Sequence, residues 1–390
     1  MGAFFMKWRD RWAAWMEQPE VTQEWLFIAG GLILSLFLRL SLWDWQTTDF
    51  TIYSGPWQDY IAQHGGWRAL KDNFGNYTPP YLYLLTIGTY LPLSKLYVVK
   101  FISLPLDFVL AWLVAKLVGL KYERRAVCWL AFFVTLFAPT VICNGALWGQ
   151  TDAGYTIFLL AALLYAIKQR PAAFMLCFGC AFALKLQAVF FAPLLVILFF
   201  RREVRLRHFL LVPAPYLLAI IPAWLIGRPL KSLLGIYSEQ AEWTADLTKN
   251  AANMYQFLPN NPTLGRAGLI LAAALVYLFC AAVTLSRKPL RRDLLVKLAL
   301  ASTLLVPYFV PRMHERYFFP ADIFAIVFAF YFPRYFYLPI IVIGISWFSY
   351  APFLFDQTPV PLIYLALVLG AALVIVAMDL TRNLLSGAAD

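Results

Sequence analysis

The sequence predicts an all-α protein that crosses a membrane many times. Hydrophobic residues make up 62% of its 390 residues and charged residues only 14%, whereas a soluble globular domain carries about 25% charged residues. Most lysines and arginines stand in short clusters between apolar runs, where positive charge fixes the orientation of membrane spans. We therefore attribute the net charge of +11 to topology, and we expect a lipid bilayer and no nucleic acid as a partner.

A single transmembrane domain is predicted over residues 25–380, between two cytoplasmic ends. Residues 1–24 mix tryptophan with basic residues and are expected to lie on the membrane as an amphipathic segment. No cleavable signal is expected, because acidic, proline-containing sequence precedes the first long apolar run. Residues 381–390 are predicted to be a cytoplasmic tail. The five cysteines lie in or beside apolar runs, so neither a disulfide nor a cysteine metal site is expected.

The apolar runs predict about 12 crossings and no large soluble domain, since a spanning helix needs about 20 apolar residues. Segment 79–97 is short, interrupted and led by prolines, so the sequence leaves open whether it crosses, re-enters or lies in the interface. The expected crossings are Trp25–Trp43, Val98–Val118, Val127–Cys143, Thr156–Ile167, the two arms of Ala172–Phe200, His208–Ile226, Gly268–Leu285, Leu294–Val310, Phe318–Phe332, Phe336–Tyr350 and Pro361–Met378.

The run Ala172–Phe200 is predicted to be a helical hairpin. Basic residues flank it on both sides, so both of its ends should be cytoplasmic. It has room for two short helices only, which places its LKLQ apex, containing Lys185, within the membrane. Non-helical backbone is tolerated at that depth only inside protein or beside a wet cavity.

Four polar stretches are expected to meet on the face opposite the basic loops. They are the first extracytoplasmic loop 44–80, the sequence NGALWGQTDAGY, the second large loop 227–266, and PRMHERY. The first loop is rich in tyrosine and tryptophan, which settle at membrane–water boundaries. We expect short helices along the membrane surface here, with Lys185 approaching from within.

Two aspartates on this face, Asp49 and Asp152, are candidate chemical groups. Asp49 directly follows a span and is either a general base or a carboxylate that caps the next helix. Asp152 starts a helix and is either part of its cap or a second carboxylate that binds a sugar hydroxyl or a metal.

Lys185 carries a charge at mid-membrane, which costs roughly 2.5–3.5 kcal/mol on insertion scales. It therefore needs an anionic partner. Asp107 is one candidate. A lipid phosphate is the favoured one, because Gln187 adds a neutral donor beside the ammonium.

The stretch PRMHERYFFP is the densest charged cluster, with Arg312, His314, Glu315 and Arg316. Two arginines at a membrane face suit a phosphate, which guanidinium groups bind bidentately. Mutually paired interfacial charges are the alternative. One histidine and one glutamate fall short of the three or four ligands of a zinc site, so no metal ligands are assigned.

Two classes of function are disfavoured by what the sequence lacks. It contains no Gly-rich phosphate loop, so ATP-driven transport has no support. It contains no soluble α/β domain with a DxD motif, so a nucleotide-sugar enzyme of the soluble type is not expected.

The motifs DF..Y, YTPPYLYLL, NGALWGQTDA, LKLQ and MHERYFFP, in this order over most of the chain, resemble the GT-C superfamily of membrane glycosyltransferases. Within it the sequence is similar to bacterial proteins related to the glycosylphosphatidylinositol mannosyltransferase that adds the second mannose. The resemblance implies a GT-C-like helical bundle and a polyprenyl-phosphate sugar donor. The first loop has a lone aspartate where some GT-C members have paired acids, so metal dependence stays open, and no cofactor is expected.

The resemblance also implies roles for individual residues. Asp49 would be the general base on the acceptor hydroxyl, and Asp152 the second acidic residue of the site. Donor phosphate would be held by cations, with other polar and aromatic residues lining the site. These substrate-binding residues are Lys185, Gln187, Arg312, His314, Glu315, Arg316, Tyr53, Trp57, Tyr77 and Gln150.

The expected function is that of an inverting hexosyltransferase, with mannose the sugar that the resemblance implies. The acceptor would be an extracytoplasmic glycan or glycolipid, and the protein would be a multi-pass protein of the cell inner (plasma) membrane. The alternative is a transporter or flippase of a lipid-linked sugar, because the same cations and aromatic rings suit that ligand.

Overall fold

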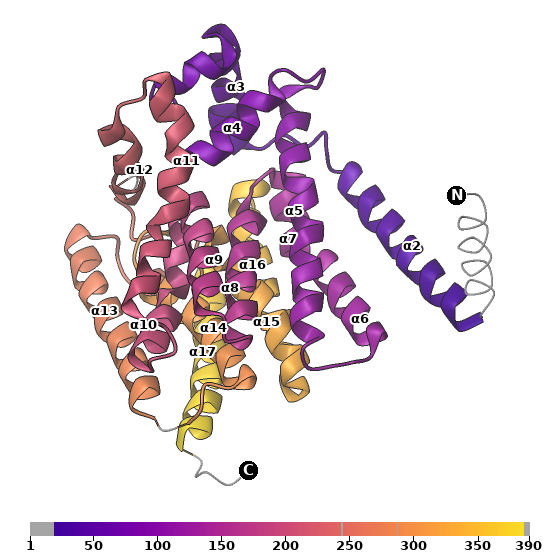
Figure 1. Cartoon of the computed structure of the whole chain (residues 1–390), viewed down its shortest axis with the longest axis vertical. Coiled ribbons are helices and arrows are strands. Elements are labelled where there is room, and N and C mark those ends of the chain that lie inside the picture. Colours follow the sequence, from indigo (N-terminus) through magenta and orange to yellow (C-terminus); the bar gives the residue numbers. More distant parts are fainter. Residues whose placement is uncertain (1–18, 243–244, 287, 386–390) are drawn as a thin grey trace.

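The computed structural model, which describes residues 19–242, 245–286 and 288–385, is built almost wholly from helices (Figure 1). In these ranges the one sheet pairs two short parallel strands, β1 (Thr248–Lys249) and β2 (Met313–His314). The prediction of an all-α membrane protein is confirmed at this level.

The helices of the bundle follow the predicted apolar runs. Their bounds are α2 (Pro19–Leu40), α5 (Lys95–Val118), α6 (Arg125–Leu136), α7 (Pro139–Ile142), η3 (Cys143–Trp148), α8 (Asp152–Ile167), α9 (Pro171–Leu184), η4 (Leu186–Phe191), α10 (Ala192–Phe200), η5 (Leu206–Leu211), α11 (Pro213–Ile226), α13 (Pro262–Leu285), α14 (Arg292–Phe309), α15 (Phe319–Tyr331), η8 (Pro333–Tyr335), α16 (Tyr337–Leu354) and α17 (Leu362–Leu385). The polar stretches fold into further short helices, η1 (Phe50–Ser54), α3 (Gly55–Gln63), η2 (Gly66–Lys71), α4 (Pro79–Gly88), α12 (Leu230–Glu242), η6 (Met254–Phe257) and η7 (Glu315–Phe318).

Both predicted ends of the transmembrane domain fall within helices. Helix α2 begins at Pro19 and α17 continues to Leu385. Residues 1–18 of the expected amphipathic segment 1–24 lie outside the described residues, as do the last residues of the expected tail.

Fewer helices meet the length and composition of a membrane span than the 12 crossings predicted. Six of the described helices do so, and a seventh is reached if Arg125–Leu136 and Pro139–Trp148, bent by 53°, form one span. Helices α8 and α9 have only 16 and 14 residues, which is about 24 and 21 Å. The prediction of 12 crossings is therefore supported for six or seven of them, and the remaining crossings stay a prediction.

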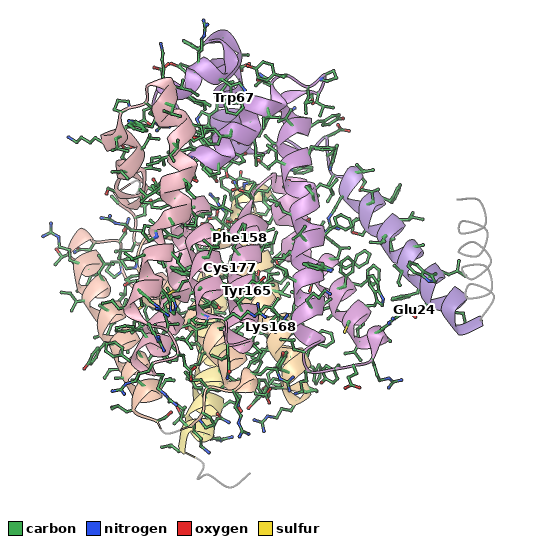
Figure 2. The ribbon with its side chains drawn as sticks, viewed as in Figure 1. Glu24, Trp67, Phe158, Tyr165, Lys168 and Cys177 are labelled. Atoms are coloured by element: carbon green, nitrogen blue, oxygen red, sulfur yellow. The ribbon has the colours of Figure 1, made fainter. Side chains whose placement is uncertain are left out.

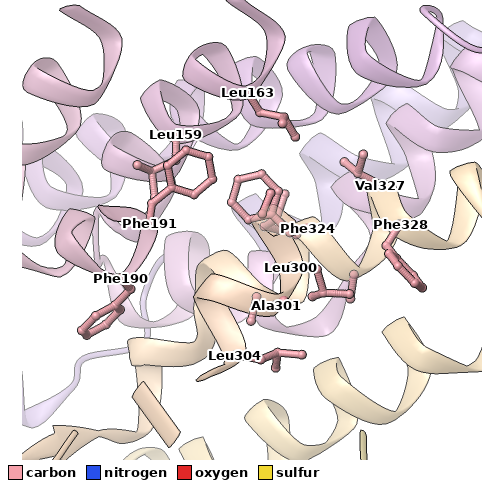
Figure 3. Packing of buried hydrophobic residues seen from close by; sticks show 14 of the residues in the cluster. Leu159, Leu163, Phe190, Phe191, Leu300, Ala301, Leu304, Phe324, Val327 and Phe328 are labelled. Atoms are coloured by element: carbon pink, nitrogen blue, oxygen red, sulfur yellow. The ribbon is translucent and has the colours of Figure 1, made fainter. Parts of the chain in front are cut away.

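Short helices form the centre of the bundle and several longer ones surround it. The main apolar core joins α8, α14 and α15, whereas α2, α11 and α13 are mostly exposed, as lipid-facing helices are. Figure 3 shows this core from close by, with Leu159 of α8 and Leu300 of α14 near the rings of Phe191 and Phe324. Those two rings stack with centroids 5.4 Å apart.

Basic side chains close the helices at one end of the bundle, called the basic end below. Arg201 donates to the carbonyl oxygens of Val283 and Ser286 at 3.2 and 2.7 Å, and Arg292 donates to that of Leu120. Cations are stabilised there by the negative ends of the helix dipoles. Lys168, which follows α8, lies toward this end, whereas Trp67 lies at the other end of the molecule (Figure 2).

The predicted hairpin is interrupted at the predicted residue. Helix α9 ends at Leu184, and Lys185 takes an extended backbone (φ −154°, ψ 135°) before η4 begins. Helix α10 then returns toward Arg201 at the basic end. Lys185 thus lies at the far end of α9, level with the start of α8.

The first polar loop is a folded cap rather than an open loop. Its helices share an apolar core that includes Trp57, Ile61, Leu70 and Leu82. Helix α4 has 10 residues, about 15 Å, so the segment 79–97 does not cross a bilayer as a single helix. The cap lies over the ends of α8 and α9 in Figure 1.

A buried ion pair ties α2 to the rest of the bundle. Arg39 Nε lies 2.9 Å from Asp107 Oδ2, with both side chains almost fully buried. Its guanidinium also donates to Ser35 Oγ and to the Leu136 carbonyl oxygen. A Cβ at Gly145 would lie 2.8 Å from Asp107 Oδ2, so the pair is tightly enclosed.

Replacing Arg39 by Met is expected to lower the free energy of unfolding by about 3–5 kcal/mol, because Asp107 then stays buried without its cation. Lys95→Met is the matched control. It breaks an ion pair with Asp59 in which both side chains are half exposed, and such pairs contribute about 0–1 kcal/mol. Chemical denaturation in detergent micelles, followed by circular dichroism, measures both losses, and equal losses would contradict the structural role of the Arg39 pair.

Candidate functional site

The four polar stretches contact one another between the cap and the far ends of α8 and α9. Tyr77 of the first stretch donates to Gln150 Oε1 of the second at 3.1 Å. Arg312 N donates to the Leu247 carbonyl oxygen at 2.7 Å, beside the β1–β2 pairing, which joins the third stretch to the fourth. This meeting place is the candidate site.

Asp49 is held by two side-chain N–H groups. Trp148 Nε1 and Gln150 Nε2 donate to its Oδ2 at 2.8 and 2.7 Å. Although Asp49 precedes η1, its side chain makes no capping hydrogen bond to that helix, so the capping alternative is not what the structure shows. The side chain remains 18% exposed, so it is accessible from outside the protein.

The two donors to Asp49 are presented by one tight turn. Gly149 lies between them with φ +77°, a conformation that residues with a Cβ rarely adopt. Lys100 of α5 supports the turn from below, because its buried Nζ donates to the carbonyl oxygens of Ala146 and Leu147.

Asp152 and Lys185 form an ion pair across the open end of the α8–α9 hairpin. Lys185 Nζ donates to Asp152 Oδ1, and Asn144 Nδ2 donates to Oδ2 at 2.8 Å. Asp152 is 0% exposed, and no side-chain cap is formed at the start of α8. The aspartate partner of Lys185 is therefore Asp152. The predicted candidate Asp107 pairs with Arg39 instead.

Arg316 lies at the centre of three carboxyl groups. Its Nη1 is 3.6 Å from Asp49 Oδ2 and 3.5 Å from Glu315 Oε1, and its Nε is 3.8 Å from Asp152 Oδ2. The guanidinium also lies over the Trp148 ring, 5.1 Å from its centroid. Trp148 thus donates to Asp49 through its edge and supports Arg316 with its face.

His314 and Glu315 follow from the β1–β2 pairing, in which His314 is opposite Lys249. Burial, together with Arg316, Lys249 and Lys185, lowers the pKa of His314 to about 3, so its ring is neutral at neutral pH. Burial raises the pKa of Glu315 to about 7, against the opposing effect of Arg316. Its side chain is 3% exposed.

The remaining predicted residues occupy different surroundings. Trp57 is buried in the core of the cap, with its ring near those of Tyr53 and Tyr77 at 5.9 and 5.5 Å, which favours packing over substrate contact. Gln187 is buried beside Lys185, and its Oε1 lacks a hydrogen bond within the described part of the chain. Arg312 is exposed, unlike Arg316.

Three groups that build the site were not predicted, namely Trp148, Asn144 and Lys100. Trp148 and Asn144 lie inside the NGALWGQTDA motif, in which Asp152 is the candidate chemical group because it carries a charge. Lys100 is a charge within a predicted span, which is itself a reason to expect a role.

The two cations of the cluster, Lys185 and Arg316, are already engaged by carboxyl groups of the protein. Two cavities of about 450 and 650 Å³ lie elsewhere, between α2 and the α5–α6 turn and between α14 and α17. Within the described ranges no group of three His, Cys, Asp or Glu side chains is placed to hold a metal ion. A ligand of this site must therefore displace ion pairs.

Comparison with models of known protein families and with curated proteins found no match to this chain.

Gly149→Ala is expected to lower the free energy of unfolding by about 2 kcal/mol or more. The left-handed backbone costs a residue with a Cβ about 1–2 kcal/mol, and the new Cβ would lie 2.7 Å from Val99 Cγ1. Gly154→Ala in α8 is the control, because the nearest atom to its Cβ is at 3.5 Å and alanine is the better helix former by about 1 kcal/mol. Denaturation in detergent compares the two, and similar losses would show that the turn at Gly149 tolerates a side chain.

Proposed function

We propose that the protein is an inverting glycosyltransferase that moves one hexose, with mannose the first to test, from a polyprenyl phosphate to a glycan or glycolipid acceptor. The observation that carries the proposal is the pairing of an accessible base with a cation. Asp49 is fixed by Trp148 and Gln150 and lies 3.6 Å from the Arg316 guanidinium. A carboxylate that accepts a proton beside a cation that receives negative charge is what such a displacement requires.

The surroundings also suit the phosphate of a lipid. Helix α8 begins at the cluster, and α15 begins directly after η7, so two positive helix ends lie near Lys185 and Arg316. Helix N-termini and arginine both bind phosphate well. Because α8 and α9 have 16 and 14 residues, they are roughly 6–9 Å shorter than a bilayer core. When the basic end is at the opposite surface, a site at their far ends lies just inside the core, below the lipid headgroups of the outer surface.

The reaction is a single displacement at the anomeric carbon. The acceptor oxygen forms a bond to that carbon while the bond to the phosphate oxygen breaks, and the phosphate leaves with the bonding electron pair. The acceptor proton goes to Asp49. As Asp49 is neutralised, the charge of Arg316 becomes available to the departing phosphate, which gains one negative charge.

The two aspartates have different roles in this proposal. Asp49 is the base because its side chain is 18% exposed, whereas that of Asp152 is 0% exposed. Asp152 positions Lys185 and Arg316 and meets no substrate in this arrangement. The resemblance implies that Asp152 is the second acidic residue of the site, and this proposal limits its role to positioning the two cations.

The proposed setting is the inner (plasma) membrane, with the site on the extracytoplasmic face. Basic residues gather at the end of the bundle away from the site, and basic loops face the cytoplasm. An acceptor on the outer face would then reach Asp49 beneath the cap.

Asp49→Asn is expected to reduce sugar transfer by about 10²–10⁴-fold, the usual contribution of a general base, while donor binding persists. The assay follows release of polyprenyl phosphate from labelled polyprenyl-phosphate mannose in proteoliposomes, with and without an acceptor extract. Asp59→Asn is the matched control, because Asp59 lies on the same stretch but is half exposed and paired with Lys95.

Acceptor-stimulated release in the wild type and in Asp59→Asn, but not in Asp49→Asn, would support the proposal. Donor that crosses the bilayer with its sugar–phosphate bond intact in all three proteins would instead identify a flippase.

A further inference from the structure

The carboxyl groups of the site outnumber its cations. Asp49, Asp152 and Glu315 surround Arg316, and Lys185 is the second cation of the cluster. With all three carboxyl groups ionised, these five mutually contacting side chains carry one net negative charge. A buried unpaired charge costs several kcal/mol, and a net negative site repels the phosphate that it is proposed to bind.

The contacts single out Glu315 as the group that carries a proton. Asp49 accepts two hydrogen bonds at 2.7 and 2.8 Å and reaches solvent. Asp152 contacts the Lys185 ammonium and accepts from Asn144 at 2.8 Å. Glu315 is 3% exposed, and its nearest cationic atom is Arg316 Nη1 at 3.5 Å, which is long for a charge-assisted hydrogen bond.

The other titratable groups around Glu315 do not supply the missing positive charge. His314 is 4.0 Å away and neutral, since its pKa is lowered to about 3 by burial and by neighbouring cations. Lys249 of β1 is partly exposed and lies near Asp246. The tyrosines that face the cluster from the cap, α8, η7 and α16 are Tyr77, Tyr155, Tyr317 and Tyr350.

We propose that Glu315 is the charge-setting residue of the site, protonated when the anionic donor binds and excluding that donor once its proton is lost. The proposal rests on the function proposed above and deepens it. With Glu315 neutral, two carboxylates balance two cations, and a phosphodiester adds a single negative charge next to Arg316. With Glu315 ionised, binding of the same donor raises the net charge of the site to two negative charges. The Glu315 carboxylate then also competes with the donor phosphate for Nη1 of Arg316.

The direction of the pH effect follows from linkage. Burial raises the pKa of Glu315 to about 7, so the protonated form prevails below that pH and is lost above it. If binding requires the proton, the Kd is constant below about pH 7 and rises about tenfold per pH unit above it. A phosphodiester donor has no titratable proton in this range, so the change belongs to the protein.

The test measures binding of polyprenyl-phosphate mannose to the full-length protein in nanodiscs between about pH 6 and 9, for the wild type and Glu315→Gln. The wild type should weaken by up to about a hundredfold over the two pH units above 7, and Glu315→Gln should bind equally well throughout. Asp72→Asn, whose carboxylate accepts from Tyr60 in the cap, is the control and should follow the wild type.

The two proposals fail in different ways. A wild-type Kd that does not change with pH, with binding present, would overturn the role of Glu315 and leave the transferase proposal standing. Absence of saturable binding at every pH would instead overturn polyprenyl-phosphate mannose as the donor of the proposed transferase. The wild-type profile alone decides between these outcomes if Glu315→Gln does not fold.

Discussion

The ion pair between Asp152 and Lys185 is the interaction on which the rest of the site depends. A charge that is buried in a bundle of apolar helices must be compensated within the protein, because water is not there to do so. Lys185 directly follows α9 and Asp152 begins α8, so their contact closes the open end of a helical hairpin. Arg316 lies beside the carboxylates of both Asp152 and Asp49, and so joins the fourth polar stretch to the second and the first.

As a consequence, both cations of the site are already paired before any ligand binds. Lys185 and Arg316 are engaged by carboxyl groups of the protein itself, so a phosphate gains them only in exchange for those partners. Such an exchange is inexpensive when a neighbouring carboxylate takes up a proton at the same moment. In the proposed reaction, proton transfer to Asp49 and the gain of negative charge on the phosphate would be coupled through a single guanidinium, that of Arg316, which lies over the Trp148 ring.

Much of the fold follows from apolar runs and basic clusters, and the sequence also predicted the interruption at Lys185. A lysine in the middle of an apolar run, flanked by basic ends, has few other solutions. The detail of the first polar stretch was not predictable, because its aromatic residues suit both an interface and a small core. In the structure Trp57 is buried in the core of the cap, whereas Tyr77 donates a hydrogen bond to Gln150 in the site.

The partners of the charged residues also escaped sequence reasoning. Lys185 and Asp107 are both intramembrane charges of opposite sign, so pairing them is reasonable without coordinates. Spacing along the chain does not reveal that Asp107 faces Arg39 of α2, nor that Asp152 faces back across its own hairpin. Trp148 was missed for a related reason, since only geometry shows that one indole contacts both Asp49 and Arg316.

The Arg39–Asp107 contact bears on how the chain enters the bilayer during synthesis. Arg39 lies one residue from the end of α2, so before α5 is inserted this long side chain can extend to the aqueous boundary. Asp107 occupies the middle of α5, where an unpaired aspartate opposes insertion by about 2.5–3.5 kcal/mol. Because α2 emerges from the ribosome first, a countercharge is already at hand when α5 arrives, and the order of the two helices along the chain favours their lateral assembly.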